Sequence, residues 1–295
     1  MSNKTFHNLA PHLLMLFAVG LAAGSFPIGA IVAGELPSSV LIFFRFLMAA
    51  LLFAPFVFFT YGFHFPSKQK FLTYLWLGLP SVIFFWCMFE SLKYTSVINT
   101  GAIYTLVPGI TAIYAVFING EKLSVKRMLA LSIGIAGAVW IVVRGDIEVL
   151  LNLDLNKGDL LFLVGCLFTA LHNPLVRKIH STEPMAVMTF WLLVTGTIWL
   201  GLLSATEMDQ VEWESVSLSV YPAVLYLAMF STLITFFIRQ KVLLIIGPTR
   251  VASYGLLAPI FVIVLSIVLG IEEFDSIYLP GMVLVGLSIF LIQKD

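Results

Sequence analysis

Long apolar segments joined by short polar connections fill almost the whole chain. Most of these segments reach the roughly 20 residues that a helix needs to cross a bilayer. The predicted spans are Leu13–Ala33, Val40–Phe59, Phe71–Leu92, Val97–Ile118, Met128–Val143, Leu160–Val176, Met185–Ala205, Val220–Ile238, Val251–Ile271 and Ile277–Ile292. The longest polar connections, Arg144–Asp159 and Thr206–Ser217, are too short to form a domain. The pattern therefore predicts an all-α membrane protein with ten transmembrane helices.

Landmarks of the first half recur in the second half at nearly constant spacing. The recurring pairs are Pro27 and Pro174, Pro37 and Pro184, Pro108 and Pro259, and Glu121 and Glu272. Each half carries five spans, and because five is odd, the second half must enter the membrane in the opposite orientation. We expect residues 1–146 to form one five-helix repeat and residues 147–295 an inverted copy. Two inverted repeats around a central cavity are an architecture for alternating access.

Small residues recur four positions apart in two predicted spans. Gly20 and Gly24 lie in the first span, and Ala130, Gly134 and Ala138 form a ladder in the fifth. Such spacing lets helix backbones approach closely in a membrane. We expect packing inside the molecule, with a homodimer face as the alternative, so the protein is expected to be a monomer or a homodimer.

Composition and charge agree with the span pattern. The chain is 60% hydrophobic and 11% charged, whereas soluble domains carry roughly a quarter charged residues. The net charge is zero, so we expect no nucleic-acid partner. Cys87 and Cys166 lie in apolar segments and are expected to be buried rather than disulfide-bonded.

Basic residues are segregated by loop. If the N-terminus is cytoplasmic, twelve of the sixteen Lys and Arg residues fall in cytoplasmic loops and ends, and three fall outside. The remaining one, Arg45, lies within a span. By the positive-inside rule, both termini are expected to be cytoplasmic.

Both halves end with the same order of features: an apolar helix with a proline, a short turn with a glutamate, and a glycine-rich helix. The segments are Leu106-Val107-Pro108, Asn119–Leu123, Gly134 and Gly137, then Leu257-Ala258-Pro259, Leu269–Glu272, Gly281 and Gly286. This paired order resembles the EamA-type branch of the drug/metabolite transporter superfamily over nearly the whole chain. The resemblance implies two inverted five-helix repeats and a cavity lined mainly by the first, third, fourth, sixth, eighth and ninth helices. It also implies export or exchange of a small metabolite, often an amino acid, across a bacterial inner membrane.

Polar residues inside apolar spans are costly and are therefore candidates for function. Arg45 in the second span is expected to act as a structural lock, with substrate-anion binding as the alternative. Glu90 ends the third span, one helical turn after Trp86 and on the same face. This pair suits an amine, through charge and cation–π attraction, and Glu90 is also a candidate proton carrier. The alternative is a Glu90 that pairs with Lys93.

The sixth span contains His172 and Asn173 directly before Pro174. A proline frees a backbone carbonyl one turn earlier, and broken helices often line transporter sites. The matching position in the first span is Pro27, preceded by Phe26. We therefore interpret His172, Asn173 and Phe26 as substrate-binding residues and both prolines as structural or gating residues. For His172, a hydrogen bond between helices is the alternative.

Tyr104 in the fourth span and Tyr254 in the ninth nearly correspond in the repeat and are further substrate-binding candidates. The alternative is packing, with the hydroxyl hydrogen-bonded across helices. Pro108 and Pro259 are expected to kink helices that rock against the other half. Arg239 and Lys241 follow the predicted end of the eighth span. They are interpreted as basic anchors that reach the lipid headgroups.

Several functional classes lack their signatures. The sequence has no phosphate-binding Gly-x-x-x-x-Gly-Lys-Ser/Thr loop, no metal-ligand spacing and no filter-like run, so we expect no cofactor, no metal and no ATP. The sequence predicts a carrier for an amino acid or similar zwitterion, with protons as a candidate coupling ion. The alternatives are a nucleotide-sugar or lipid carrier, a channel, or an intramembrane enzyme built on His172 and Glu90. We do not expect an enzyme.

Overall fold

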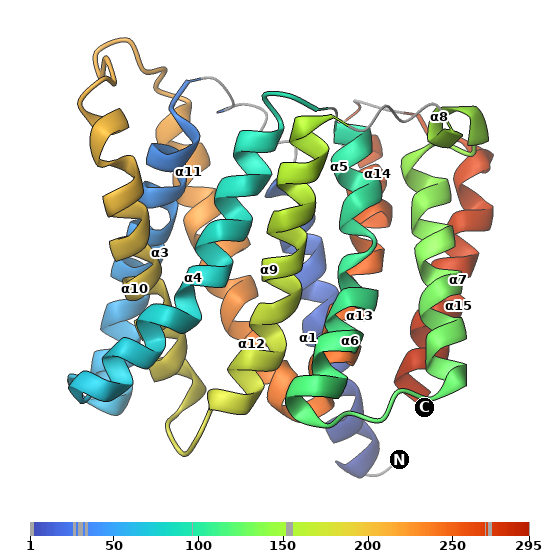
Figure 1. Ribbon diagram of the computed structural model, residues 1–295, viewed down its shortest axis with the longest axis horizontal. Helices are drawn as coiled ribbons and strands as arrows, with labels where there is room; N and C mark the ends of the chain where they lie inside the picture. Colours follow the sequence, from blue (N-terminus) through green and yellow to red (C-terminus); the bar gives the residue numbers. More distant parts are fainter. Residues whose placement is uncertain are drawn as a thin grey trace.

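The computed structural model describes residues 3–25, 28, 32, 35–95, 97–151, 156–268, 270 and 273–294. Every regular element in these residues is a helix, and the long helices lie roughly side by side (Figure 1). Nine helical segments are long and apolar enough to cross a membrane, and a shorter apolar stretch, Leu9–Ala23, precedes them. The described part of the chain thus has the ten apolar helices that the sequence predicts.

The two halves have matching element orders. The first half contains α1 (Asn3–Ala23), α3 (Ser38–Tyr61), α4 (Lys68–Ser91), α5 (Val97–Tyr104), α6 (Val107–Asn119) and α7 (Val125–Val142). A short helix, α8 (Ile147–Leu151), follows. The second half contains α9 (Lys157–Ile179), α10 (Met185–Met208), α11 (Val220–Ala228), a π-helix (Met229–Ile234), α12 (Thr235–Ile246), α13 (Pro248–Ser253), a 3₁₀-helix (Tyr254–Leu257), α14 (Ala258–Val268), a second 3₁₀-helix (Ser276–Tyr278) and α15 (Leu279–Lys294). The first helix begins ten residues before its predicted start, Leu13.

Helix ends follow local sequence signals that recur between the halves. Pro37 and Pro184 occupy the N-cap positions of α3 and α10, the second spans of the two halves. At the start of α9, Asn156 and Asp159 form a reciprocal capping box. Ser67 caps α4 by accepting a hydrogen bond from the Lys70 amide. Thus the repeated prolines mark equivalent helix starts.

The fourth and ninth spans are both interrupted just before a proline. In the fourth span, a turn separates α5 from α6, and Pro108 lies in the first turn of α6. In the ninth, the 3₁₀-helix separates α13 from α14, and Pro259 lies at the start of α14. Proline is well placed at a helix start because it has no amide hydrogen to lose there. The predicted kinks are therefore breaks in the helix at equivalent places.

The halves run in opposite directions and pack helix against helix. In Figure 1, α1 leaves the edge where both termini lie, whereas α9 runs towards that edge. The principal contacts pair a helix of one half with a helix of the other: α7 with α15, α4 with α9, α3 with α10, α1 with α12, and α6 with α13. The first spans of the two halves are α1 and α9, and their third spans contain α4 and α12. The contact of α4 with α9 and the contact of α1 with α12 are therefore equivalent, and the fold is a pair of inverted five-helix repeats.

Close glycine contacts join α7 to α15 at one edge of the bundle. A side-chain carbon on Gly137 would lie 2.8 Å from the Gly281 carbonyl oxygen, and the Ser288 hydroxyl donates to the Ala130 carbonyl at 2.6 Å. Gly20 likewise packs against Phe261 of the same chain. The small residues therefore serve packing within the molecule.

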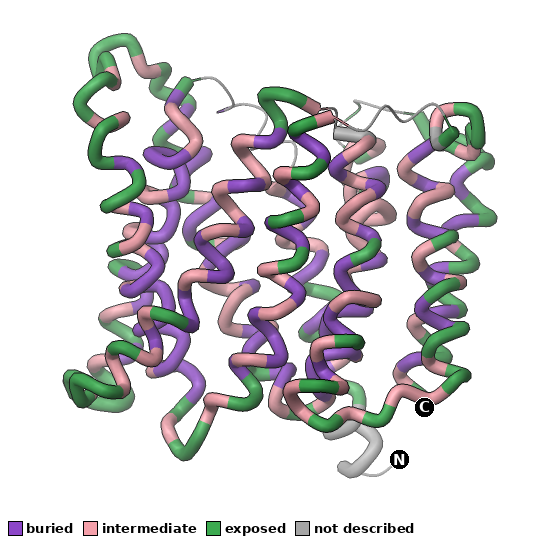
Figure 2. The backbone as a smooth tube through the Cα atoms, viewed as in Figure 1, coloured by how far each residue is buried: buried purple, intermediate pink, exposed green. Residues whose placement is uncertain are grey.

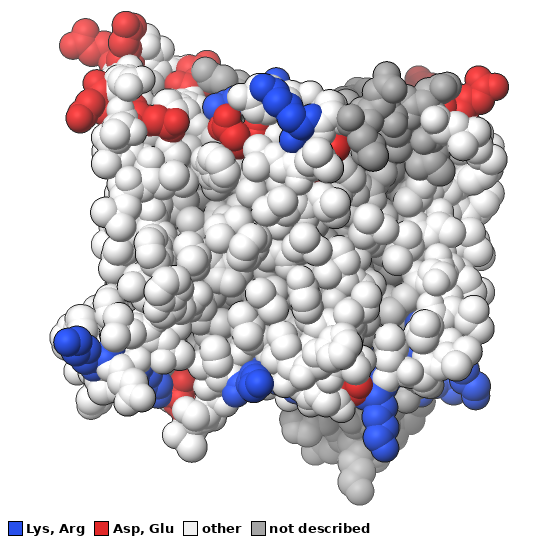
Figure 3. Space-filling model, in the orientation of Figure 1, with Lys and Arg blue, Asp and Glu red and all other residues white. Residues whose placement is uncertain are grey.

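The surface is divided into an apolar belt and two charged edges. Lys and Arg gather on the edge that carries both termini, and most Asp and Glu gather on the opposite edge (Figure 3). Between the edges, large apolar side chains such as Leu51 and Ile113 are more than half exposed. Buried positions lie where helices face one another (Figure 2). This is the surface expected of a protein in a bilayer.

Candidate functional site

His172 and Asn173 lie inside the bundle on α9. Both are at least nine-tenths buried. His172 Nδ1 lies 3.2 Å from the Leu77 carbonyl oxygen on α4, and its ring packs against Phe236 of α12 with centroids 5.5 Å apart. Because a carbonyl only accepts, Nδ1 donates and Nε2 of the neutral ring is an acceptor. Neither His172 Nε2 nor Asn173 Nδ2 has a partner among the described residues.

Arg239 lies on the same face of α12 as Phe236, one turn further along. Its guanidinium acts electrostatically on both His172 and Tyr104. The prediction that the eighth span ends at Ile238 is wrong, because α12 continues to Ile246. Arg239 therefore lies about 10 Å before the end of its helix rather than at the membrane edge.

Tyr104 lies at the end of α5, next to the interruption in the fourth span. Its ring packs against Phe84 with centroids 6.1 Å apart, and it also lies close to Gly255 of the ninth span. Its hydroxyl makes no hydrogen bond to any residue that the structure describes. Tyr104 and His172 thus share Arg239 as an electrostatic neighbour, and Phe236, one turn from Arg239, packs on the His172 ring.

Tyr254 belongs to a different contact. Its side chain is 2% exposed, and its hydroxyl lies 2.6 Å from His12 Nδ1 on α1. Arg250 also acts electrostatically on His12. The hydroxyl of Tyr254 is thus bonded across helices, which is the alternative that the sequence left open. The sequence did not identify His12 as a partner because the two residues are 242 positions apart.

Arg45 is held by the π-helix of the eighth span. Its guanidinium is 2% exposed, donates to the Ser231 carbonyl oxygen at 3.1 Å and also bonds the Thr232 hydroxyl. It lies over the Phe85 ring, 4.8 Å from the centroid. Nη1 has no partner in the described part of the chain. These contacts link α3, α4 and the π-helix, as a structural lock would.

Trp86 and Glu90 lie towards the edge opposite the termini. Glu90 forms an ion pair with Lys93 at 2.6 Å, and its side chain is 19% exposed. It ends α4, whereas His172 lies beyond the middle of α9, nearer the opposite edge. The structure therefore does not bring Glu90 together with His172.

The predicted gating prolines differ in their surroundings. Pro174 is buried within α9, and its carbonyl accepts a 3.1 Å hydrogen bond from Asn119 Nδ2 at the end of α6. Pro108 and Pro259 follow the helix interruptions described above. Phe26 and Pro27 lie outside the described residues.

Polar contacts link helices at both ends of the bundle. At the edge with the termini, Glu121 binds Arg177 at 2.6 Å and accepts a hydrogen bond from the Thr249 hydroxyl, also at 2.6 Å. At the opposite edge, Asp159 binds Thr95 and accepts from Asn99 at 3.1 Å. The Glu121 cluster joins the end of the fourth span and the start of the ninth to the sixth span. The Asp159 cluster joins the start of the fourth span to the sixth.

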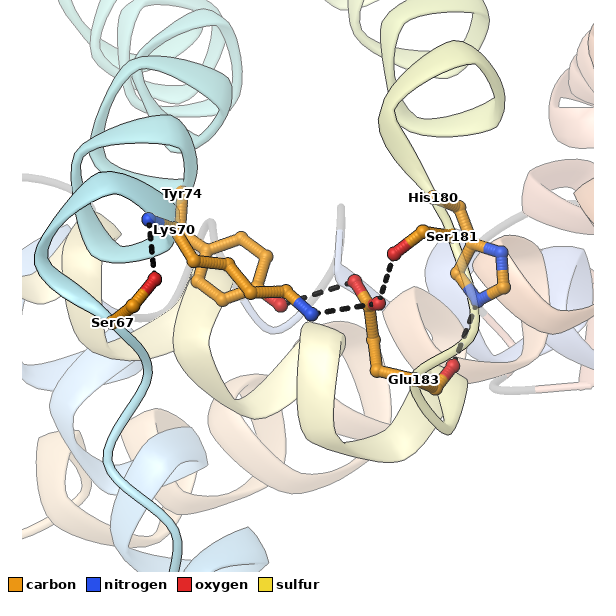
Figure 4. Close-up of polar contacts among 6 residues, drawn as sticks. All are labelled: Ser67, Lys70, Tyr74, His180, Ser181 and Glu183. Atoms are coloured by element: carbon orange, nitrogen blue, oxygen red, sulfur yellow. Dashed lines mark hydrogen bonds and ion pairs between the residues drawn. The ribbon is translucent and has the colours of Figure 1, made fainter.

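A further cluster links the start of α4 to the connection between α9 and α10 (Figure 4). Glu183 accepts hydrogen bonds from Lys70 at 2.8 Å, Ser181 at 2.6 Å and Tyr74 at 3.1 Å. Burial raises the pKa of Glu183, but these hydrogen bonds outweigh burial and lower the pKa to about 2. The carboxylate therefore stays charged and bonded.

No group of His, Cys, Asp and Glu side chains within the described ranges could hold a metal ion. Cys87 and Cys166 are both buried and unbonded to each other. The candidate residues on α5, α9 and α12 supply instead hydrogen-bonding side chains, one guanidinium and aromatic rings.

Comparison with known proteins agrees with this architecture. The chain is 26% identical over 250 residues to an uncharacterized transporter, YyaM, of Bacillus subtilis, covering 83% of this chain and 81% of that protein. It is 28% identical over 264 residues to an uncharacterized transporter of Archaeoglobus fulgidus, covering 86% and 87%. A crystal structure with 15% identity superposes with a TM-score of 0.77 over 96% of both chains, which supports the fold alone.

The model of the EamA-like transporter family matches the chain twice, over residues 9–143 and 156–293. The two matches coincide with the two five-helix repeats and together cover most of the chain. The relatives over comparable lengths are themselves named transporters. The protein therefore belongs to the EamA-like transporter family, within the drug/metabolite transporter superfamily.

Proposed function

We propose that this transporter is a secondary carrier that moves an amino acid or similar amphiphilic zwitterion by alternating access. The observation that carries the proposal is a set of unsatisfied polar atoms deep in the bundle: His172 Nε2, Asn173 Nδ2 and Thr111 Oγ1. An unsatisfied polar group in an apolar interior costs about 1–3 kcal/mol. A passing substrate that forms these hydrogen bonds offsets that cost.

The two closing clusters support alternating access. The Glu121 cluster joins α6, α9 and α13 at one edge, and the Asp159 cluster joins α5 and α9 at the other. Breaking one cluster while the other holds would open the interior to one side only. The proposed domains are the two repeats, residues 1–146 and 147–295.

We place the carrier in the cell inner membrane with both termini in the cytoplasm. The edge that carries the termini is the one rich in Lys and Arg (Figure 3), as the positive-inside rule requires. Export or exchange is the proposed direction, driven by the substrate gradient or by protons. The proposal includes no catalytic reaction, and the separation of Glu90 from His172 supports this.

Trp86 and Glu90 form a proposed outer contact for the ammonium group of the substrate. The ion pair with Lys93 competes with that role, so a substrate amine would displace Lys93. We expect Glu90→Gln to slow counterflow severalfold, measured from pH 5 to pH 8. Transport at the wild-type rate throughout this range would eliminate both the amine role and the proton role of Glu90.

Counterflow in proteoliposomes tests the proposed function. The vesicles are loaded in turn with amino acids, amines, nucleosides, sugars and nucleotide-sugars, and uptake of the labelled compound is followed. We expect saturable counterflow with amino acids. Non-saturable flux would indicate a channel, and no flux in any class would contradict the carrier.

One observation favours a second substrate class. Arg239 and Arg250 both lie in the half of the bundle near the termini, and basic residues suit a phosphate-bearing substrate such as a nucleotide-sugar. Counterflow confined to nucleotide-sugars would support this alternative and retain the carrier.

A further inference from the structure

Arg239 has an unusual environment for a cation inside a membrane bundle. It makes no hydrogen bond and no ion pair with any residue that the structure describes. Its side chain is only partly exposed. Intramembrane arginines normally pair with carboxylates or backbone carbonyls, as Arg45 does. A cation left without such a partner is available to an anion that enters from outside.

The direction of α12 favours a guanidinium that points towards the middle of the bundle. The N-terminal end of the eighth span lies at the edge opposite the termini (Figure 1). The Cα–Cβ bonds of a helix tilt towards its N-terminus, so the Cα–Cβ bond of Arg239 points towards the middle of the bundle. This direction is opposite to the one that would bring it to the nearer headgroups. The packing of Phe236 on His172 places the same face of α12 against α9.

The groups around Arg239 have complementary hydrogen-bonding capacity. His172 presents Nε2 as an acceptor, because Nδ1 donates to the Leu77 carbonyl. Tyr104 presents a hydroxyl without a hydrogen bond in the described part of the chain. A guanidinium beside an acceptor matches a molecule that carries a carboxylate beside an N–H or O–H donor.

We infer that Arg239, His172 and Tyr104 form the subsite that binds the α-carboxylate and the adjacent amino or hydroxyl group of the substrate. Arg239 binds the carboxylate, His172 Nε2 accepts from the α-substituent, and Tyr104 donates its hydroxyl to a carboxylate oxygen. This inference rests on the proposed carrier function. It selects α-amino and α-hydroxy acids rather than phosphates, because the subsite contains one guanidinium and no second cation among the described side chains.

Competition in counterflow tests the subsite. Uptake of a labelled mixture of the proteinogenic amino acids is measured against unlabelled amino acids, their α-amides and their 2-hydroxy acids. In the wild type, we expect the amides to compete at least tenfold more weakly than the acids, and the hydroxy acids to remain effective. Equal competition by acids and amides would overturn the inference while retaining the carrier.

Variants of α12 provide matched controls. We expect Arg239→Gln to reduce uptake at least tenfold and to remove the preference for acids over amides. Arg239→Lys should retain part of that preference. Such a result would exclude misfolding as the reason why Arg239→Gln loses it. Lys241→Gln, an exposed change two residues away, should behave as the wild type. An Arg239→Gln protein that keeps the preference, or counterflow restricted to phosphorylated solutes, would contradict the carboxylate subsite. Absence of all counterflow would instead contradict the proposed function itself.

Discussion

Glu183 illustrates how one side chain can join separate segments. Three donors from α4 and the α9–α10 connection meet its carboxylate, whose side chain is 9% exposed. The ordinary pKa of 4.5 falls to about 2 in the folded protein. A lowered pKa contributes stability that is present above pH 4.5 and is lost as the pH falls towards 2.

We therefore expect Glu183→Gln to lower the melting temperature at neutral pH. Loss of hydrogen bonds to a charged group corresponds to about 1.5–3 kcal/mol. The difference in melting temperature between the variant and the wild type should shrink as the pH falls from 4.5 to 2. Thermal unfolding in detergent at a series of pH values measures it. The control is Glu148→Gln, an exposed residue on α8, which should show no such pH-dependent difference. A difference that stays constant across this range would rule out the carboxylate as its source.

At the residue scale, the sequence located interior candidates but not their partners. His172, Asn173 and Tyr104 were predicted because polar groups in apolar spans are costly. Arg239, which we propose as a site residue, was not among these candidates because the predicted end of its span fell eight residues early. Hydropathy drops wherever a charged residue occurs, so a functional charge near the end of a span resembles a helix end.

At the scale of helices, glycine decides how closely α7 and α15 approach. A side-chain carbon on Gly137 would meet the Gly281 carbonyl at 2.8 Å, whereas one on Gly286 would meet nothing within 4 Å. We expect Gly137→Ala to destabilise the protein by about 1–3 kcal/mol and Gly286→Ala to be neutral or slightly stabilising. Thermal unfolding of both variants measures the contrast, and equal melting temperatures would refute the close packing.

Interruptions of helices were predictable only where proline marks them. Pro108 and Pro259 indicated irregularity, and the structure has a turn and a 3₁₀-helix directly before them. The π-helix at Met229–Ile234 had no such signal, because one extra residue changes neither hydropathy nor length detectably. Its Ser231 carbonyl and Thr232 hydroxyl accept hydrogen bonds from Arg45, a tertiary contact that hydropathy does not reveal.

At the scale of the whole molecule, the odd number of spans per repeat predicted the inversion, and the structure shows it. The pairing of particular helices across the halves could not be predicted, because lipid-facing and protein-facing apolar residues have similar composition in a membrane. The expected central cavity remains a prediction.

The orientation in the membrane can be measured with single cysteines. Cys87 and Cys166 are replaced first, and Lys126→Cys and Glu212→Cys are then introduced at opposite exposed edges. We expect a membrane-impermeant maleimide to label Glu212→Cys in intact cells and Lys126→Cys only after permeabilisation. The reverse pattern would place the termini outside.

The π-helix determines the rotational phase of the eighth span. Its wide turn takes up one residue more than an α-helical turn, so every later residue is rotated by about 100° relative to an uninterrupted α-helix. Arg45 fixes that extra residue in place through Ser231 and Thr232. If the wide turn shifted along the helix, the residues that it passed would change faces.

Arg45 would then determine which way the Arg239 side chain faces, although the two residues are not in contact. We expect Arg45→Met to weaken the preference for acids over amides, measured by the same competition assay, while Arg239 itself is intact. An unchanged preference in a folded Arg45→Met protein would show that the phase is fixed by other contacts. Substrate selection by Arg239, near the edge with the termini, would thus depend on a helical phase fixed by Arg45 nearer the opposite edge.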